Sequence, residues 1–414
     1  MTMCGRAAPG KIAAYSVGLF GFRLSDAEGG VDIQVGTRAL LLFDGLGISA
    51  VEVIRRLRHF YAMGEFRDFL GLAAVELDKV FDYAHSTGIP DVSREFDLRE
   101  WLAGPQLPPA TTAENSVVAA LVGHIYQLCL LQPQVRLSRD GNHVAALGHS
   151  LGLHAAVVAA LEVRRAEEFA EVGARSIRLL AMGLLRVHQV AAEPPASALA
   201  RQYAAANPWL ARPAPMAALT GVSSSQVREL LDEWHATCER ADEARIPLVL
   251  GLINSPRMQA LSGSTDDLLH FYFKTQGTAW QGKQTWSFIP GTAPFHNPGL
   301  EAALRLLRDD MDFVGPGTPG TEFRFPVYAT NGTGDLALHE DPAVEVTRLS
   351  AVEAVDWPST VDQAMRAHEP DLLLDFGPGV AALAFTRDCL RAQRQRVRTV
   401  SAQQPFLNSM AGTR

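Results

Sequence analysis

The feature that most constrains the fold of this chain is the sequence GHSLG at residues 148–152. An apolar segment precedes it, and a long stretch rich in Ala, Leu and Arg follows it to about residue 192. A strand, a sharp glycine-flanked turn and a helix, in that order, form a nucleophile elbow that exposes a serine hydroxyl. Amide N–H groups at the helix start then face any negative charge that develops there. We predict that Ser150 is a nucleophile; the alternative is a glycine turn with a capping serine.

Other segments place this elbow in an alternating pattern of strands and helices. An apolar run at residues 38–43 ends in a glycine turn, which is typical of a buried parallel strand. Residues 48–102 have helical spacing, and a capping-box pattern that begins at Thr111 precedes an apolar helix over residues 117–131. Further elements are a helix over residues 300–311 and strands over residues 143–147, 325–330 and 372–376. The pattern predicts an α/β protein with a parallel sheet.

The segment between residues 213 and 290 has a different order of predicted strands and helices. It contains strand, helix, strand, strand, helix and strand patterns at residues 215–222, 223–238, 246–253, 258–262, 265–275 and 286–289. This order is typical of a ferredoxin-like unit. We therefore divide the chain into an N-terminal extension (1–37), an α/β-hydrolase-like catalytic subdomain (38–212 and 291–414) and a ferredoxin-like small subdomain (213–290).

Composition narrows the range of partners. The 414 residues carry a formal charge of −8, which disfavours a nucleic-acid partner. The four cysteines lie far apart and have no metal-ligand spacing, so we expect no metal and a cytoplasmic location. Residues 12–22 are apolar, but they are too few to span a bilayer and lack a cleavage site. We predict a strand or docking segment there, and no membrane partner.

A serine nucleophile needs a base, because its hydroxyl is only weakly nucleophilic until its proton is removed. Among the 12 histidines, His296 is the best candidate. It lies in a proline-bounded loop, residues 294–298, where the chain returns from the small subdomain. Loops that a rigid scaffold positions often carry function.

Several segments, in order, resemble the malonyl/acetyl acyltransferase family of fatty-acid and polyketide synthesis. The resemblance is greatest to the acetyltransferase domain of the fungal-type fatty acid synthase β chain and to starter-unit acyl-carrier-protein transacylases. In the list that follows, the sequence of this chain is given first in each bracket and the family motif second. The segments are residues 42–47 (LFDGLG, FPGQG), 148–153 (GHSLGL, GHSxGL), 254–263 (NSPRMQALSG, NSPxQxVISG), 294–297 (PFHN, PFHS), 356–358 (DWP, VDWP) and 375–379 (DFGPG, DFGPG).

The resemblance implies a Ser–His dyad that moves an acyl group between thioesters. Ser150 attacks the thioester of acyl-CoA or of a carrier-bound acyl group, and His296 is the general base. The acyl group then passes to the phosphopantetheine thiol of an acyl carrier protein. The N–H groups of Leu46 and Leu151 form the oxyanion hole. A backbone carbonyl orients the histidine, and no cofactor is bound.

Departures from the family pattern bear on the substrate. His149, Asn254 and Asn297 lie in the matched motifs and are predicted to contact it, although Asn297 stands where the family has Ser. Leu46 stands where the family has Gln. Malonyl-specific members hold the free carboxylate with an arginine.

Two alignments of that arginine position are possible. The fungal-type register places Met182 there, which predicts an uncharged acyl group, acetyl or longer. The shorter bacterial register places Arg175 there, which predicts malonyl.

Three other functions remain open at this stage. An editing thioesterase on the same scaffold would pass the acyl group to water. A true α/β-hydrolase needs a histidine near the C-terminus, where only His339 and His368 occur. A degenerate, non-catalytic partner would not need Ser150. Arginines at residues 387–398 form either a carrier-docking surface or, more simply, a solvated face.

Overall fold

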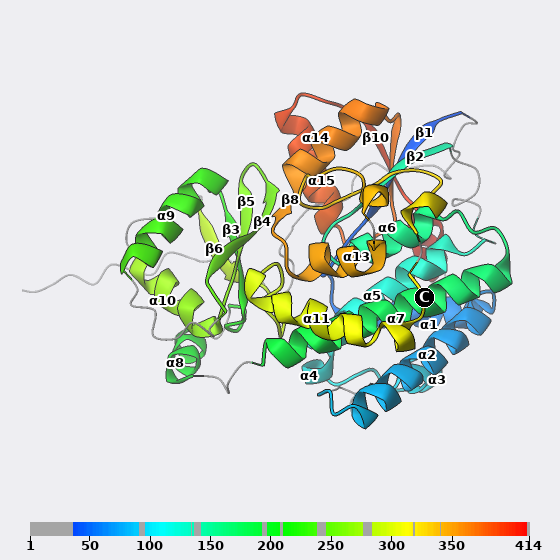
Figure 1. Cartoon of the computed structure of the whole chain (residues 1–414), viewed down its shortest axis with the longest axis horizontal. Helices are drawn as coiled ribbons and strands as arrows, with labels where there is room; N and C mark the ends of the chain where they lie inside the picture. Colours follow the sequence, from blue (N-terminus) through cyan, green and yellow to red (C-terminus); the bar gives the residue numbers. More distant parts are fainter. Residues whose placement is uncertain are drawn as a thin grey trace, which may run out of the picture.

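The computed structural model describes residues 36–90, 96–133, 135, 142–192, 197–207, 210–237, 246–275, 284–317, 319–339 and 341–411. The segment at residues 12–22 lies outside this set. Two sheets, each with its own helices, lie next to each other (Figure 1). The α/β class with a large and a small subdomain is confirmed.

The large subdomain is built on a five-stranded parallel sheet in the order β10-β9-β1-β2-β7. Its strands are β1 (Arg38–Phe43), β2 (Asn142–Gly148), β7 (Val327–Tyr328), β9 (Leu372–Asp375) and β10 (Arg398–Ser401). Strand β7 is shorter than the predicted 325–330. Strand β10 was not predicted because its sequence RTVS is polar and only half-buried at the sheet edge.

Helices cover both faces of the large sheet. Leu41 and Phe43 of β1 pack with α1, α2, α5, α6 and α7, whereas Leu40 and Leu42 pack with α14 and α15. The alternation follows from the two-residue period of a strand. The helices of the first face are α1 (Ala50–Met63), α2 (Arg67–Ser86), α5 (Ser116–Leu131), α6 (Gly152–Ala160) and α7 (Ala166–Val190), and those of the second are α14 (Trp357–His368) and α15 (Ala381–Ala392).

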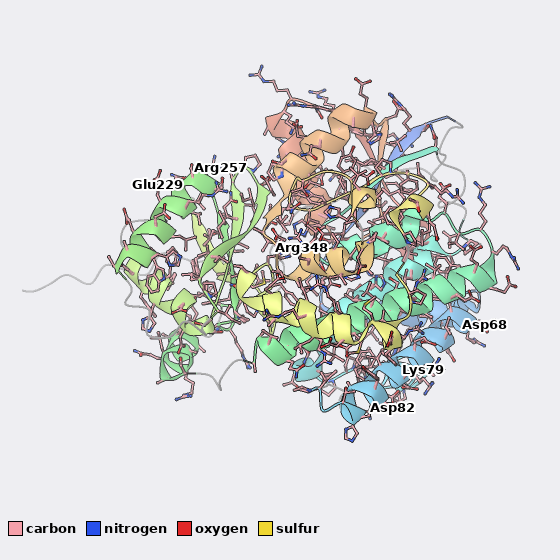
Figure 2. All side chains as sticks on the ribbon, in the orientation of Figure 1. Asp68, Lys79, Asp82, Glu229, Arg257 and Arg348 are labelled. Carbon is pink, nitrogen blue, oxygen red and sulfur yellow. The ribbon has the colours of Figure 1, made fainter. Side chains whose placement is uncertain are left out.

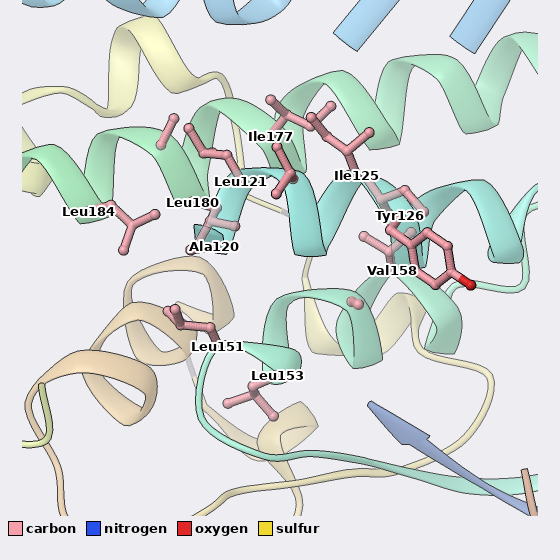
Figure 3. Packing of buried hydrophobic residues seen from close by; sticks show 14 of the residues in the cluster. Ala120, Leu121, Ile125, Tyr126, Leu151, Leu153, Val158, Ile177, Leu180 and Leu184 are labelled. Carbon is pink, nitrogen blue, oxygen red and sulfur yellow. The ribbon is translucent and has the colours of Figure 1, made fainter. Parts of the chain in front are cut away.

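The helix that follows Ser150 is anchored in this core. Figure 3 shows Leu151 and Leu153, at the start of α6, below Leu180 and Leu184 of α7. All four side chains are buried. Burial of one such side chain contributes about 1.5–3 kcal/mol. The turn that carries Ser150 is therefore supported by well-packed side chains.

The small subdomain contains β3 (Met216–Thr220), β4 (Val249–Ser255), β5 (Met258–Ser262) and β6 (Thr285–Phe288), with α9 (Ser224–Thr237) and α10 (Thr265–Thr275). Its strand order β6-β3-β5-β4 is antiparallel, as a ferredoxin-like unit requires. A fifth strand, β8 (Val355–Asp356), pairs parallel to β4. Because β8 comes from the C-terminal part of the chain, it ties the small sheet to the large subdomain.

The remaining α-helices of the described residues are α3 (Leu98–Ala103), α4 (Ala110–Ala113), α8 (Ala198–Ala206), α11 (Glu301–Asp309), α12 (Met311–Val314), α13 (Pro342–Ala351) and α16 (Gln404–Ala411), and the 3-10 helices are η3 (Pro298–Leu300), η4 (Gly320–Glu322) and η5 (Leu336–Leu338). Charged side chains such as Asp68, Lys79 and Asp82 project from the exposed side of α2 (Figure 2). Within the ranges given above, no helix has the length and apolar character needed to cross a membrane.

Among the C-terminal arginines, Arg391 and Arg398 lie away from the edge where Ser150 stands. Helix α15 begins beside the carboxyl ends of the strands and ends at the opposite edge, near Arg391. Arg398 begins β10 at that opposite edge and pairs in register with Leu372. Arg391 also forms an ion pair with Asp388. This placement favours a solvated face over a carrier-docking surface near Ser150.

The start of α5 differs from the prediction. Thr111 does not cap it, because residues 110–113 form the separate short helix α4. Asn115 is the N-cap instead, and its side-chain oxygen accepts the Val117 N–H at 2.8 Å. The capping-box pattern was wrong because the chain turns again at residues 114 and 115 before α5 begins.

Replacing Asn115 with Ala should lower the free energy of unfolding by about 1 kcal/mol, the usual effect of losing an N-cap. Thr111→Ala is the matched control, since Thr111 is exposed and should leave stability unchanged. Urea unfolding monitored by circular dichroism measures both. A larger loss for Thr111→Ala would contradict the assignment.

Candidate active site

Three loops meet at the carboxyl edge of the large sheet. Phe43 pairs in register with Gly148, and Leu42 pairs with Asp375, so β1, β2 and β9 end together. The loops that follow are residues 44–47, 149–151 and 376–380. The chain leaves β1 for β2 on one side and returns later as β9 on the other. Such a switch point is where open parallel sheets place their sites.

Ser150 and His296 meet at this edge. The Ser150 Oγ lies 2.7 Å from the His296 Nε2. The His296 Nδ1 lies 2.8 Å from the backbone oxygen of Glu353. Since a carbonyl only accepts hydrogen bonds, Nδ1 carries the proton and Nε2 presents its lone pair to the serine hydroxyl. This is the tautomer that a general base needs.

Both residues have a positive backbone φ, which residues other than glycine rarely adopt. Ser150 has φ 53° and His296 has φ 60°. The His296 N–H donates to the carbonyl of Ala351, the last residue of α13, at 2.6 Å, and this bond holds the histidine loop in place. Strain of this kind persists only where the surroundings impose it, and it clusters at functional sites.

Burial keeps the histidine uncharged. His296 is 1% exposed, and desolvation lowers its pKa to about 4. The Glu353 carbonyl partly opposes this by raising the pKa, and His149 lowers it further. At neutral pH the imidazole is therefore neutral and able to accept a proton.

The predicted oxyanion donors lie where the loop of residues 44–47 meets the serine turn. Gly45 lies directly against this turn: a Cβ there would be 2.7 Å from the His149 oxygen and 3.5 Å from the Leu151 nitrogen. In the described part of the chain, neither the Leu46 nor the Leu151 N–H donates to a backbone or side-chain acceptor. Free donors beside a nucleophile are what an oxyanion hole requires.

His149 and Asn254 form a buried pair beneath the serine. The His149 Nε2 and the Asn254 Oδ1 are 2.9 Å apart, and the two residues are 6% and 5% exposed. The His149 ring packs edge-on against Trp357. The pair therefore joins the serine turn to β4, and the predicted substrate contact of these two residues stays a prediction.

Asn297 also has a different task from the one predicted. Its Nδ2 donates to the Pro247 carbonyl at 2.7 Å, and its Oδ1 accepts the Gly299 N–H at 2.9 Å. It is completely buried. The amide fastens the histidine loop to the small subdomain and leaves no face for a substrate.

Met182 and Arg175 lie in different surroundings on α7. Met182 is completely buried in the main hydrophobic core. Arg175 lines a surface pocket with Leu161 and Pro316; His154 of α6 also lines this pocket, but neither Ser150 nor His296 does. Which of Met182 and Arg175 faces the acyl group stays a prediction.

The resemblance implied a backbone carbonyl behind the histidine, but sequence reasoning could not name Glu353 or Ala351, because any residue type supplies a carbonyl. It also missed a buried pair of carboxyl groups, Asp44 and Asp375, under the same edge. Burial raises the pKa of Asp44 to about 6 and that of Asp375 to about 7. Asp44 adds to the rise at Asp375, since two like charges resist ionising together. In the described residues, no group of three or more His, Cys, Asp and Glu side chains could hold a metal ion.

No protein-family model matches the chain. Solved structures share the fold, including the acyl-carrier-protein S-malonyltransferase of Burkholderia pseudomallei (17% identity, 88% of this chain and 96% of that chain, TM-score 0.60). Others are the malonyl-CoA:acyl carrier protein transacylase of Helicobacter pylori (15% identity, 91% and 97%, TM-score 0.62) and the acyltransferase domain of SpnD in complex with 2-(pent-4-yn-1-yl)malonyl (16% identity, 91% and 72%, TM-score 0.61). The chain has the acyltransferase fold of these proteins.

The free energy of unfolding of the Asp375→Asn variant should rise relative to that of the wild type as the pH increases from 5 to 7. The folded state holds the Asp375 proton to about pH 7, whereas the unfolded chain releases it near pH 3.8. Wild-type stability therefore falls with pH in this window, and the Asn variant escapes that fall. Urea unfolding at pH 5, 6, 7 and 8 measures the difference, which should level off by pH 8.

The matched control is Asp371→Asn, at the other end of β9. Asp371 pairs with Arg38, which holds the pKa of that carboxyl below its usual value. Its stability difference from the wild type should stay constant between pH 5 and 8. A constant difference for Asp375→Asn as well would contradict the raised pKa.

Proposed function

We propose that this protein is an acyl-carrier-protein S-acyltransferase of fatty-acid or polyketide synthesis, with Ser150 and His296 as its catalytic dyad. The observation that carries the proposal is the 2.7 Å contact between the Ser150 Oγ and the unprotonated Nε2 of a buried, neutral His296. Two amide N–H groups with no protein acceptor lie beside it. The shared fold with acyl-carrier-protein malonyltransferases supports the same reaction class.

In the first half-reaction, the Ser150 oxygen attacks the thioester carbonyl carbon while its proton moves to the His296 Nε2. The carbonyl oxygen becomes an oxyanion that accepts hydrogen bonds from the Leu46 and Leu151 N–H groups. One such donor contributes about 3–4 kcal/mol to the transition state. The C–S bond then breaks, the thiol leaves with the proton from His296, and an acyl-serine ester remains.

The second half-reaction runs in reverse with a new thiol. His296 removes the proton from the phosphopantetheine thiol of the carrier protein, and the sulfur attacks the ester carbonyl. The C–O bond breaks, and the proton returns to Ser150. Acyl-CoA and an acyl carrier protein are thus the proposed partners, and no cofactor takes part in either step.

The acyl group that we propose is uncharged, acetyl or longer. A malonyl carboxylate buried beside Met182 would lack a cationic partner, and burial of an unpaired charge is strongly unfavourable. The similar proteins named above include malonyltransferases, so malonyl is the alternative donor. It would require Arg175 to reach the acyl group.

Brief incubation with acetyl-, hexanoyl- and malonyl-CoA, followed by intact-protein mass spectrometry, tests the reaction. We expect an adduct from acetyl- or hexanoyl-CoA that Ser150→Ala abolishes and that His296→Ala forms 10²–10⁴-fold more slowly. Free CoA produced steadily without an adduct or an acceptor would indicate a thioesterase. No adduct and no CoA release, from free donors or from acyl carriers, would contradict enzymatic function.

Arg175→Met should leave the choice of donor unchanged, because neither Ser150 nor His296 lines the pocket that Arg175 lines. If Arg175 held a malonyl carboxylate, the variant would lose malonyl adduct formation by about 10–100-fold, the usual worth of a charge-assisted pair. The same three donors and mass measurement decide between these outcomes. Arg178→Met, one turn further along α7, is the control for general effects on that helix.

A further inference from the structure

The loop that carries the Leu46 N–H is anchored by the Asp44 carboxylate. The Asp44 Oδ1 accepts the N–H groups of Gly45 at 3.0 Å and Ala382 at 3.1 Å. The Asp44 Oδ2 accepts the Ala381 N–H at 3.1 Å. Ala381 and Ala382 are the first residues of α15, so one side chain joins the loop after β1 to a helix more than 300 residues later.

The partner of this anchor is itself fixed. Asp44 donates its backbone N–H to the Gly377 carbonyl at 3.1 Å. The Gln127 Nε2 donates both to the Asp44 carbonyl at 2.8 Å and to the Gly377 carbonyl at 2.5 Å. Arg56 donates to the Pro378 carbonyl at 2.8 Å. Residues 377 and 378, which precede the helix start that Asp44 binds, are thus hydrogen-bonded to α1 and α5 and held in place independently of residues 44–47.

Asp44 lies close in sequence to the backbone N–H that is proposed to face the Ser150 site. Asp44 is two residues from the Leu46 N–H, and the intervening Gly45 lies against the serine turn. The carboxylate is 3% exposed, so water competes little for its hydrogen bonds. A buried carboxylate with three N–H donors is strongly held, and hydrogen bonds to a charged group contribute about 1.5–3 kcal/mol each.

We propose that Asp44 is a positioning residue: its carboxylate ties residues 44–47 to the first turn of α15 and so keeps the Leu46 N–H aimed at the oxyanion site. This inference rests on the proposed acyl transfer and adds to it a residue outside the dyad. The resembling family motif has Pro at this position, which has no carboxylate, so the anchor is a feature of this chain's own residues.

The test is the rate of acyl-serine formation at pH 8 in Asp44→Asn and Asp44→Ala, with an acyl-CoA donor that the wild type accepts. An N–H that is poorly aimed weakens only the transition state, so kcat should fall and KM should stay the same. We expect a 10–100-fold loss in kcat for Ala. A smaller loss is expected for Asn, whose oxygen can still accept the Gly45 and Ala382 N–H groups.

Asp97→Ala is the control for lost stability, because it removes the N-cap of α3, where the Asp97 side chain accepts the Glu100 N–H, and it should keep the wild-type rate. Thermal unfolding of every variant verifies that the assayed protein is folded. Wild-type kcat in Asp44→Ala, a rise in KM at constant kcat, or equal losses in Asn and Ala would overturn the role of Asp44. A wild-type protein without any Ser150 adduct would instead contradict the proposed function, which separates the two failures.

Discussion

The structure depends on the register of three parallel strands. Because β1, β2 and β9 end at the same level, the loops after Phe43, Gly148 and Asp375 are brought together although they are far apart in the sequence. Each loop contributes something different to this edge. The first carries backbone donors, the second carries Ser150, and the third receives the Asp44 anchor. A one-residue slip in β1 would exchange the side chains that face the two layers of helices, Leu41 and Phe43 on one side and Leu40 and Leu42 on the other, and would move the loop after Phe43 out of level with the other two.

The small subdomain completes the site rather than standing apart from it. Strand β8 pairs with β4, and the His149–Asn254 pair links the serine turn to the same strand. Asn297 fastens the histidine loop to the strands of the small sheet. His296 is thus held from both sides, by Ala351 and Glu353 of the large subdomain and by Asn297 through the small one. Contacts between the subdomains thus help to set the distance between the Ser150 Oγ and the His296 Nε2.

The sequence was sufficient for the elements that have a strong local pattern. The buried strands, the elbow around Ser150 and the order of elements in the small subdomain all followed from apolar runs and glycine turns. The candidate base His296 followed from a short proline-bounded loop. The fold was predictable because continuous apolar strands and an interrupted helical pattern allow few other architectures.

Other features were not predictable, for reasons that are physical. The carbonyls of Ala351 and Glu353 have no sequence signature. Asn254 and Asn297 lie in the matched motifs, but only the packing shows that the Asn254 Oδ1 and the whole Asn297 amide are hydrogen-bonded within the protein. Which of Met182 and Arg175 aligns with the family's arginine could not be counted from Ser150, because the break at residues 161–165 between α6 and α7 interrupts the helical count.

The use of a carbonyl rather than a carboxylate behind His296 has a chemical consequence. A carboxylate would stabilise the imidazolium and raise the pKa of the histidine. The Glu353 carbonyl fixes the tautomer with little charge, and burial keeps the pKa near 4. The result is a base that is always in the correct protonation state at neutral pH but is weak. The same low pKa means that the imidazolium, once it has taken a proton, gives it up readily. The Glu353 carbonyl therefore fixes which nitrogen faces Ser150, and burial fixes the protonation state in which that nitrogen can accept a proton.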